Sequence, residues 1–369
     1  MSTLRALARV NVAAIERNVA RLRRDLRPGA ELCAVVKADG YGHGAAPAAR
    51  AALAGGATWI AVAAAGEAAD LRAAGIDARL LVLGALSPSE LDVALKADAD
   101  VTVWREDVVA AVAARGGGRV HVKLDTGMGR LGTRDPDEAT RVAVSAAAAE
   151  GVHLAGAMTH FATADERGDA FFGEQLARFQ AWVRPLVDRH PQVVVHAANS
   201  AALLRDAASH FDLARAGVAI YGLDPFQEDA AAQDLEPALE LASYVAEVKA
   251  CTVGESVGYG RRFVAERDTV IATVPIGYGD GVRRALTNNA EVLVHGRRFP
   301  LVGTVSMDNV TLDLGPDVGG VRPGDEALLI GPGLPAEEMA ARLATINYEI
   351  TCALTGRVPR AHHRDGVPL

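Results

Sequence analysis

The sequence predicts an α/β chain in which an N-terminal (β/α)₈ TIM-type barrel is followed by a C-terminal, mostly antiparallel β domain. Three observations predict this class. Short apolar runs alternate with Ala-rich amphipathic segments up to about residue 220, the runs number eight, and near residue 236 the pattern changes to alternating strands without helices between them. A length of 369 residues is sufficient for a barrel of about 250 residues with an appended domain.

The eight apolar runs are the predicted barrel strands. Each run is almost continuously apolar, as a parallel sheet that is buried on both faces requires. Eight such strands close naturally into a barrel, although an open, doubly wound sheet is the competing arrangement. The predicted strands are Leu32–Val36, Trp59–Ala63, Leu80–Leu83, Val101–Trp104, Val120–Leu124, Leu154–Met158, Val193–His196 and Phe211–Ala214.

The segments between these strands are predicted helices. Residues 89–97, 105–115 and 173–190 carry Glu and Arg on one face and apolar residues on the other, which is typical of surface helices. Ser87 and Asp135 each precede a proline and are the predicted N-caps of two of the helices.

The C-terminal part is predicted to be a separate domain. The segments TVIATVPIGYGDG, AEVLVHGRRFPLVG and VSMDNVTLDLG alternate apolar and polar residues and are broken by Gly, Asp and Pro. One helix is expected in PAEEMAARLATI, and the acidic stretch 224–237 is the expected linker. We therefore divide the chain into residues 1–235 and 236–369, with the first residues, up to about residue 10, a candidate to pair with the second domain.

Composition excludes two classes of partner. A net charge of −8 argues against nucleic acid, because a phosphate-backbone binder needs a basic face. The most continuously apolar stretch, residues 57–66, is too short for a membrane span of about 20 residues. Arg5, Arg9 and Asn11 interrupt the apolar core that a signal peptide would need, so a cytoplasmic protein is expected.

The three cysteines do not form a metal site or a disulfide framework. Cys33, Cys251 and Cys352 lie far apart and match no metal-ligand spacing. We expect all three to be small buried side chains in a reduced protein without a bound metal.

Polar residues follow the predicted barrel strands, where barrel enzymes place their reactive groups. Lys37 is the clearest candidate for a reactive residue, because it directly follows an apolar strand and its side chain begins inside the barrel. Desolvation disfavours the ammonium form of lysine, and a neutral amine can attack a carbonyl to form a Schiff base. The glycines of the following ADGYGHG loop allow the backbone to approach a ligand closely.

The segment AVVKADGYGHG resembles the pyridoxal-phosphate lysine segment of the alanine racemase family, barrel-type enzymes of fold type III. The blocks KLDTGMGRLG, THFATAD, HAANSAA, ARAGVAIYGL, VGYGRRF, PIGYGDG, SMDNV and YEITCALTGRVPR resemble blocks of that family in the same order. The resemblance therefore extends over nearly the whole chain and implies the cofactor pyridoxal 5′-phosphate.

The resemblance implies a set of cofactor-binding residues. Lys37 is similar to the lysine that forms the Schiff base with the cofactor, and Arg215 to the arginine that faces the pyridine nitrogen. Because a guanidinium only donates, such a nitrogen stays unprotonated and the ring is a weaker electron sink. His160 resembles the histidine that lies along the ring. The implied phosphate ligands are Tyr41, Tyr348, Ser200 and the backbone amides of Gly217 and Val218.

Two further barrel residues carry implied roles toward the substrate. Arg130 resembles the residue that binds the substrate carboxylate, for which a guanidinium fork is well suited. Lys123 resembles a lysine that is carbamylated in some members of the family. A carbamate there would replace repulsion between two cations by a hydrogen bond.

The second implied base lies in the C-terminal domain. Tyr259 resembles the tyrosine that reaches into the barrel of a partner subunit, and the segment with Met307 and Asp308 is implied to do the same. Tyr278 is a lesser candidate for the site. The resemblance therefore implies a homodimer with composite active sites.

The implied activity is interconversion of L- and D-alanine by two bases, Lys37 and Tyr259, which supplies D-alanine for peptidoglycan. Three alternatives stay open at this point. They are a racemase for serine or lysine, an amino-acid decarboxylase of fold type III, and a barrel-only protein that binds pyridoxal phosphate without turnover. The last two fit less well, because this sequence lacks an EPGR-like segment and has a β domain.

Overall fold

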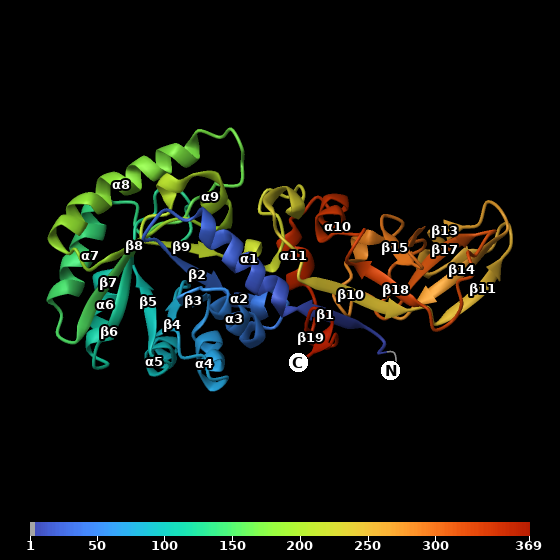
Figure 1. Ribbon diagram of the computed structural model, residues 1–369, viewed down its shortest axis with the longest axis horizontal. Coiled ribbons are helices and arrows are strands. Elements are labelled where there is room, and N and C mark those ends of the chain that lie inside the picture. The colour runs from blue at the N-terminus through green and yellow to red at the C-terminus, as the bar shows by residue number, and fades with distance from the viewer. Residues whose placement is uncertain (1–3) are drawn as a thin grey trace. The chain divides into compact units, whose positions relative to one another are not determined.

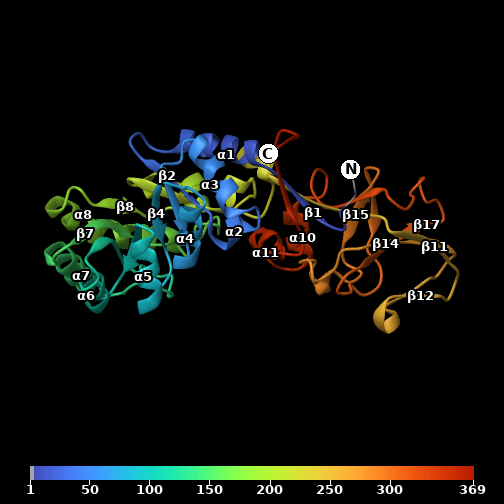
Figure 2. The same cartoon turned by 90° about the horizontal axis from the view of Figure 1, so that it is seen from below.

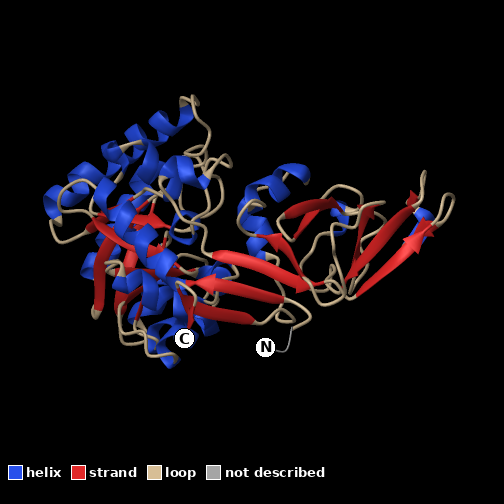
Figure 3. Ribbon diagram, turned by 45° about the vertical axis from the view of Figure 1, so that its right-hand side comes forward, coloured by secondary structure: helices blue, strands red, loops and turns tan. Residues whose placement is uncertain are grey.

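The computed structural model describes residues 4–369 as two compact units. One unit holds Ile15–Phe226 and Ala230–Glu236. The other holds the N-terminal residues up to Ala14, Gln227–Asp229 and Pro237–Leu369. Figure 3 shows their different make-up, since helices surround the strands of the first unit and strands dominate the second.

The first unit is a barrel of eight parallel strands (Figures 1 and 2). Neighbouring strands follow chain order from β2 to β8, and β9 pairs with β2. Hydrogen bonds from the Asp212 amide to the Val195 carbonyl (3.0 Å) and from the Arg215 amide to the Ala198 carbonyl (2.9 Å) join the two ends of the sheet. This order confirms the predicted barrel and excludes the doubly wound sheet.

The barrel strands are β2 (Glu31–Val35), β3 (Trp59–Val62), β4 (Arg79–Val82), β5 (Ala99–Val103), β6 (Gly118–Lys123), β7 (Val152–Met158), β8 (Val194–His196) and β9 (Leu213–Ala216). The helices of the chain's N-terminal part are α1 (Val12–Asp25), α2 (Lys37–Tyr41), α3 (Ala45–Ala54), α4 (Ala65–Ala73), α5 (Pro88–Lys96), α6 (Glu106–Ala113), α7 (Pro136–Ala148), α8 (Phe171–Arg189) and α9 (Ser200–Arg205).

Both predicted N-caps are confirmed. The Ser87 side chain accepts a hydrogen bond from the Glu90 amide at the start of α5, and that of Asp135 accepts one from the Asp137 amide (2.9 Å) at the start of α7. Each cap satisfies a backbone donor that the first turn of a helix leaves without a partner.

The last barrel strand differs from its prediction. It was expected at Phe211–Ala214 but lies at Leu213–Ala216, because Phe211 has a φ of 48°, which is incompatible with a strand. The Phe211 ring instead packs edge-on against Phe179 of α8. The shift of two residues places Arg215 inside the strand rather than after it.

The second unit is built mainly from antiparallel strands. Its largest sheet runs β16-β15-β18-β10-β1-β19-β20, in which the N-terminal strand β1 (Leu7–Asn11) pairs antiparallel with β10 and parallel with β19. A three-stranded sheet has the order β11-β14-β17, and β12 and β13 form a hairpin. The remaining elements are β10 (Leu239–Tyr244), β11 (Glu247–Cys251), β12 (Ser256–Val257), β13 (Phe263–Val264), β14 (Thr269–Val274), β15 (Glu291–Val294), β16 (Arg297–Pro300), β17 (Val310–Gly315), β18 (Glu326–Ile330), α10 (Ala336–Arg342), α11 (Asn347–Cys352), β19 (Arg360–Arg364) and β20 (Val367–Pro368).

The expectation of three buried cysteines is wrong for one of them. Cys33 and Cys251 are buried, but Cys352 is exposed. The buried face of the short helix α11 contains Asn347, Ile350 and Thr351. Cys352 is the next residue after that face and therefore turns toward solvent.

Helix α1 packs closely against Gly55, the residue that follows α3. A Cβ at Gly55 would approach the Glu16 carbonyl oxygen to 2.5 Å and the Val19 side chain to 2.8 Å. Gly55→Ala is therefore expected to lower the free energy of unfolding by about 1–3 kcal/mol through overpacking. Gly66→Ala in α4 meets open space and is the matched control, expected to be neutral or slightly stabilising. Equal urea midpoints for the two variants would contradict this packing.

Candidate active site

Lys37 opens a left-handed turn at the carboxyl end of β2. The four residues after it have positive φ: 53° at Ala38, 51° at Asp39, 61° at Gly40 and 53° at Tyr41. Left-handed backbone costs L-residues roughly 1–2 kcal/mol each. Such strain persists only where the surrounding structure fixes it, which is common at functional sites.

Glu67, at the start of α4, holds this turn in place. One of its carboxylate oxygens accepts a hydrogen bond from the Ala38 amide (2.6 Å), and the other accepts bonds from the amides of Ala63 (2.8 Å) and Ala64 (3.0 Å). The loops after β2 and β3 are thereby tied together. Sequence reasoning missed Glu67, because an acidic residue in the first turn of a helix is usual without any role in a site.

Four of the five expected phosphate ligands lie together at this turn. The Ser200 hydroxyl accepts hydrogen bonds from the amides of Gly217 (2.9 Å) and Ala219 (3.4 Å). Gly217 passes so close to the Tyr41 hydroxyl that a Cβ would overlap it. The ammonium of Lys37 lies 5.9 Å from the centre of the Tyr41 ring. Val218 follows in the buried 3₁₀ turn Val218–Tyr221.

Cations gather at the same end of the barrel. Lys123, at the end of β6, is 4% exposed, and burial together with the charges of Arg215, Arg130 and Lys37 lowers its pKa to about 8. Burial lowers the pKa of Arg215 to about 10, so this guanidinium stays charged at neutral pH. Burial and the same cations hold the pKa of His160 well below its usual range, so its imidazole is neutral.

The loop that carries Arg130 is held by a buried carboxylate. The Asp125 carboxylate accepts hydrogen bonds from the amides of Gly127 and Gly129, each at 3.0 Å, and the Asp125 amide donates to the Thr133 carbonyl (2.8 Å). The loop is closed at its base, and the exposed Arg130 lies at its tip.

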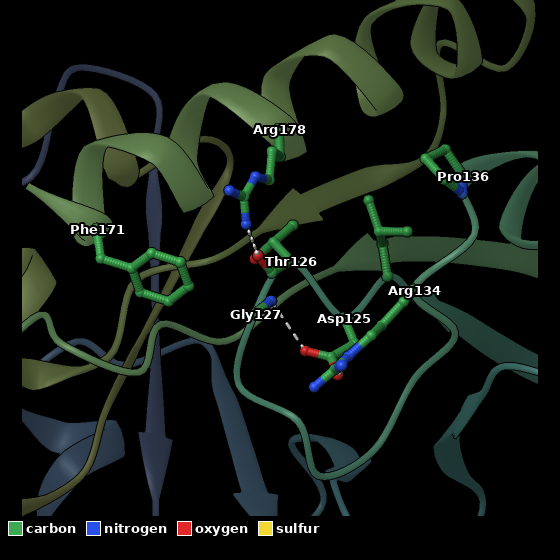
Figure 4. A pocket seen from close by; sticks show the side chains of 8 residues that line it. Asp125, Thr126, Gly127, Arg134, Pro136, Phe171 and Arg178 are labelled. Carbon is green, nitrogen blue, oxygen red and sulfur yellow. Dashed lines mark hydrogen bonds and ion pairs between the residues drawn. The ribbon is translucent and has the colours of Figure 1, made fainter.

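A cavity of about 430 Å³ lies behind this loop (Figure 4). The Arg178 side chain of α8 donates a hydrogen bond to the Thr126 carbonyl (3.1 Å), and the Phe171 ring lies on the same side of the cavity. The lining contains none of the expected site residues; it consists of Leu124, Asp125, Thr126, Gly127, Arg134, Pro136, Phe171 and Arg178.

The C-terminal unit presents its expected site residues at its surface. Tyr259 begins a tight 3₁₀ turn, its side chain is 74% exposed, and its carbonyl accepts a hydrogen bond from the Thr304 hydroxyl (2.6 Å). The Tyr278 amide donates to the Ser306 carbonyl (3.0 Å), so the loop with Tyr278 lies against the one with Met307.

An ion network around one buried carboxylate connects these two loops. The Asp280 carboxylate is fully buried and pairs with Arg5 and Arg357. Arg357 also binds the Asp308 carboxylate at 2.6 Å, so this exposed ion pair connects Asp308 with the buried Asp280. Tyr348 lies in α11 of the same unit and is half-buried.

Residues 4–369 show neither a candidate metal site nor a candidate membrane span. No group of three or more His, Cys, Asp or Glu side chains is arranged to hold a metal ion. None of the described helices is both long and apolar enough to span a membrane.

Comparison with known proteins matches both parts of the chain to one family. Residues 10–225 match the family model "Alanine racemase, N-terminal domain", and residues 238–362 match "Alanine racemase, C-terminal domain". The chain belongs to the alanine racemase family. The resemblance predicted from the sequence is therefore confirmed.

Members of the alanine racemase family with the same length support this assignment. Alanine racemase of Thermobifida fusca is 44% identical and the alignment covers 97% of this chain and 98% of that protein. Alanine racemase of Desulfovibrio desulfuricans is 40% identical, with coverage of 96% and 97%.

Solved structures of the family share the fold over almost every residue. Alanine racemase from D-cycloserine-producing Streptomyces lavendulae has a TM-score of 0.91 at 38% identity and covers 98% of each chain. Alanine racemase from Bacillus anthracis, solved with bound L-Ala-P, has a TM-score of 0.89 at 37% identity, with coverage of 99% and 96%.

Burial of Lys123 makes the stability of the chain depend on pH. Its pKa falls from 10.5 to about 8 on folding, so between these values the unfolded chain binds more protons and stability rises with pH. Below pH 8 the folded protein carries the full cost of a buried ammonium. We expect Lys123→Met to stabilise the protein by roughly 1–3 kcal/mol at neutral pH, with the gain fading toward pH 10.5.

Urea unfolding in CO₂-free buffer, without added cofactor, measures this dependence. Lys96→Met is the matched control, because Lys96 is exposed on α5. A Lys123→Met gain that is the same at neutral and alkaline pH would contradict the buried ammonium.

Proposed function

We propose that the chain binds pyridoxal 5′-phosphate at the mouth of the barrel and interconverts L- and D-alanine. The observation that carries the proposal is the convergence of Lys37, Lys123, Arg130 and Arg215 around two neutral donors, Tyr41 and Ser200. The positive charge of these side chains outweighs the nearby carboxylate of Asp125. Such a site fits a ligand that brings a phosphate and, with the substrate, a carboxylate.

The donor set fits the phosphate end of the cofactor. The hydroxyls of Tyr41, Ser200 and Tyr348 and the amides of Gly217 and Val218 are neutral donors of the kind that bind phosphate. Because residue 217 is a glycine, no side chain fills the space between its backbone and the Tyr41 hydroxyl. When bound, the cofactor would act as an electron sink for the charge left at Cα of the amino acid.

The remaining barrel residues bind the cofactor and the substrate and transfer a proton. Lys37 holds the cofactor and, with its amine free, exchanges a proton with one face of Cα. Arg215 would donate to the ring nitrogen of the bound cofactor, and His160 would lie beside that ring. Arg130 binds the substrate carboxylate, for which its fork geometry is suited.

The Lys123 amine is included in this proposal as a carbamate. An amine with a pKa of about 8 is largely neutral in mildly alkaline solution and can take up CO₂. A mass spectrum recorded at mild pH would show the carbamate as one added CO₂.

Tyr259 is the second base in this proposal and belongs to a partner subunit. A tyrosine that is 74% exposed in a fixed turn, beside the exposed Met307 and Tyr278, is typical of a surface that another subunit covers. In the homodimer, the β-rich unit of one subunit completes the active site in the barrel of the other. Tyr259 then exchanges the proton on the opposite face of Cα, with Met307 and Asp308 beside the substrate. We place the enzyme in the cytoplasm, where its product supplies peptidoglycan.

A racemisation assay over a panel of L-amino acids, with and without pyridoxal phosphate, tests the function. We expect cofactor-dependent turnover of alanine at least about tenfold above serine and lysine, because added side-chain atoms cost about 1–3 kcal/mol in a closed pocket. Preference for serine or lysine would overturn the substrate. Release of CO₂ would indicate a decarboxylase, and binding without turnover would indicate a carrier of the cofactor.

Tyr259→Phe separates the two bases. The family resemblance assigns the α-hydrogen of L-alanine to Tyr259 and that of D-alanine to Lys37. Removal of the phenol takes away the first proton acceptor but leaves Lys37, so solvent-deuterium exchange at Cα of L-alanine should fall by about 10²–10⁴-fold while exchange into D-alanine is largely kept. Tyr244→Phe, a change of the same size in β10, is the control. Equal loss of exchange from both enantiomers would contradict a two-base mechanism.

A further inference from the structure

A column of polar side chains crosses the interior of the barrel. It consists of Asp100 on β5, His121 on β6, His196 on β8 and Arg215 on β9, and at least 97% of each residue's surface is buried. Branched aliphatic side chains usually fill this space in barrels. Polar groups there are costly unless each has a hydrogen-bond partner.

Each member of the column contacts the next through one hydrogen bond. Arg215 Nη1 lies 2.7 Å from His196 Nδ1, His196 Nε2 lies 2.7 Å from His121 Nδ1, and His121 Nε2 lies 2.9 Å from Asp100 Oδ2. Three bonds therefore connect the cation at the mouth of the barrel with a carboxylate deep inside it.

The two ends of the column fix the direction of every bond. Arg215 can only donate, so His196 Nδ1 accepts and, in a neutral ring, Nε2 carries the proton. His196 Nε2 then donates to His121 Nδ1, and His121 Nε2 donates to the carboxylate. Burial, followed by the charge of Arg215, holds the pKa of His196 well below its usual range, and burial also lowers the pKa of His121, in agreement with two neutral rings.

The carboxylate end is anchored by two arginines. Asp100 pairs with Arg79 (2.8 Å) and with Arg119, and Arg79 stacks on the ring of Trp59. Burial alone would raise the pKa of Asp100, but the hydrogen bond from His121 and the two arginines lower it to about 2. Asp100 is therefore an acceptor at every pH at which the protein is used.

The position of the His121 ring is also built into the barrel. A Cβ at Gly156 of β7 would overlap the His121 imidazole, and the ladder between β6 and β7 shifts register at this point. The Trp59 ring packs edge-on against His121 at 5.7 Å. The glycine thus provides the space into which the imidazole fits.

We propose that Asp100 and His121 are positioning residues that, through His196, hold Arg215 as a fixed donor toward the cofactor ring nitrogen. This inference rests on the proposed function, because Arg215 is assigned to that nitrogen there. The other guanidinium nitrogen donates to the carbonyls of Thr159 (2.8 Å) and Ala197 (3.0 Å). The guanidinium is therefore held from two sides.

The column matters because His196 has two tautomers. When Nδ1 is unprotonated, it accepts a hydrogen bond from Arg215. When Nδ1 carries the proton, two N–H donors face each other, and the Arg215 guanidinium must turn away. His121 and Asp100 select the first tautomer. Lys123, His160 and Cys33 also face Arg215, but none of them bonds to the far nitrogen of His196.

The first test reads the tautomer itself. The chain has ten histidines, and with ¹⁵N-labelled histidine the Nδ1 and Nε2 resonances of His196 report its tautomer with and without bound cofactor. We expect Nε2–H alone in the parent protein and a mixture of tautomers in His121→Phe. Gly156→Ala, which displaces the ring without changing a charge, should give the same mixture. Gly173→Ala in α8, where a Cβ meets open space, is the control.

The second test reads the consequence for the reaction. If Arg215 turns away, the ring nitrogen of the cofactor can be protonated, and the enzyme should lose cofactor by transamination more often per racemisation turnover. We expect this ratio to rise roughly tenfold in His121→Phe and Gly156→Ala, about the effect of one hydrogen bond to a charged group. Asp100→Asn should raise it too, because the amide no longer provides a charged acceptor.

The two tests distinguish failure of this inference from failure of the proposed function. An Nδ1–H tautomer of His196 in the parent protein, or an unchanged tautomer in both His121→Phe and Gly156→Ala, would overturn the column whatever the enzyme catalyses. An altered tautomer with an unchanged transamination ratio in an active racemase would overturn the role assigned to Asp100 and His121. Absence of racemase activity in the parent protein would instead overturn the proposed function.

Discussion

The structure depends above all on buried positive charge at the carboxyl ends of the barrel strands. Lys123 and Arg215 are almost fully enclosed, and their charges act on each other and on His160. Charged groups in such surroundings are expensive unless a partner compensates them. The cost is reasonable only for a site whose ligand is anionic, and the neutral donors around Tyr41 and Ser200 suit a phosphate.

The local structure prepares this site before a ligand arrives. The left-handed turn after Lys37 is costly by itself, and Glu67 compensates it with hydrogen bonds to three backbone amides. The column from Asp100 to Arg215 fixes one guanidinium from inside the barrel. In both places a carboxylate outside the site orients a basic residue inside it. This preorganisation lowers the reorganisation needed when the reaction begins.

Much of this could be predicted from the sequence, because continuous apolar runs can be read without tertiary information. The strand that precedes Lys37 and the strands that end at Lys123 and His196 agree with their predictions within two residues. The last strand is shifted, because the left-handed conformation of Phe211 has no local signal. The role of Glu67 and the polar column were not predictable, since they depend on side chains from different strands meeting in the closed barrel. His121 is a partial hint, as a polar residue between two valines of a predicted buried strand.

The most direct test identifies the lysine to which the cofactor is covalently attached. The chain has four lysines, Lys37, Lys96, Lys123 and Lys249, so reduction of the cofactor-loaded enzyme with borohydride and peptide mapping distinguishes them without ambiguity. The account predicts one modified peptide, containing Lys37. Modification of Lys123 instead, or an even spread over the exposed Lys96 and Lys249, would show that the turn after β2 does not hold the reactive amine.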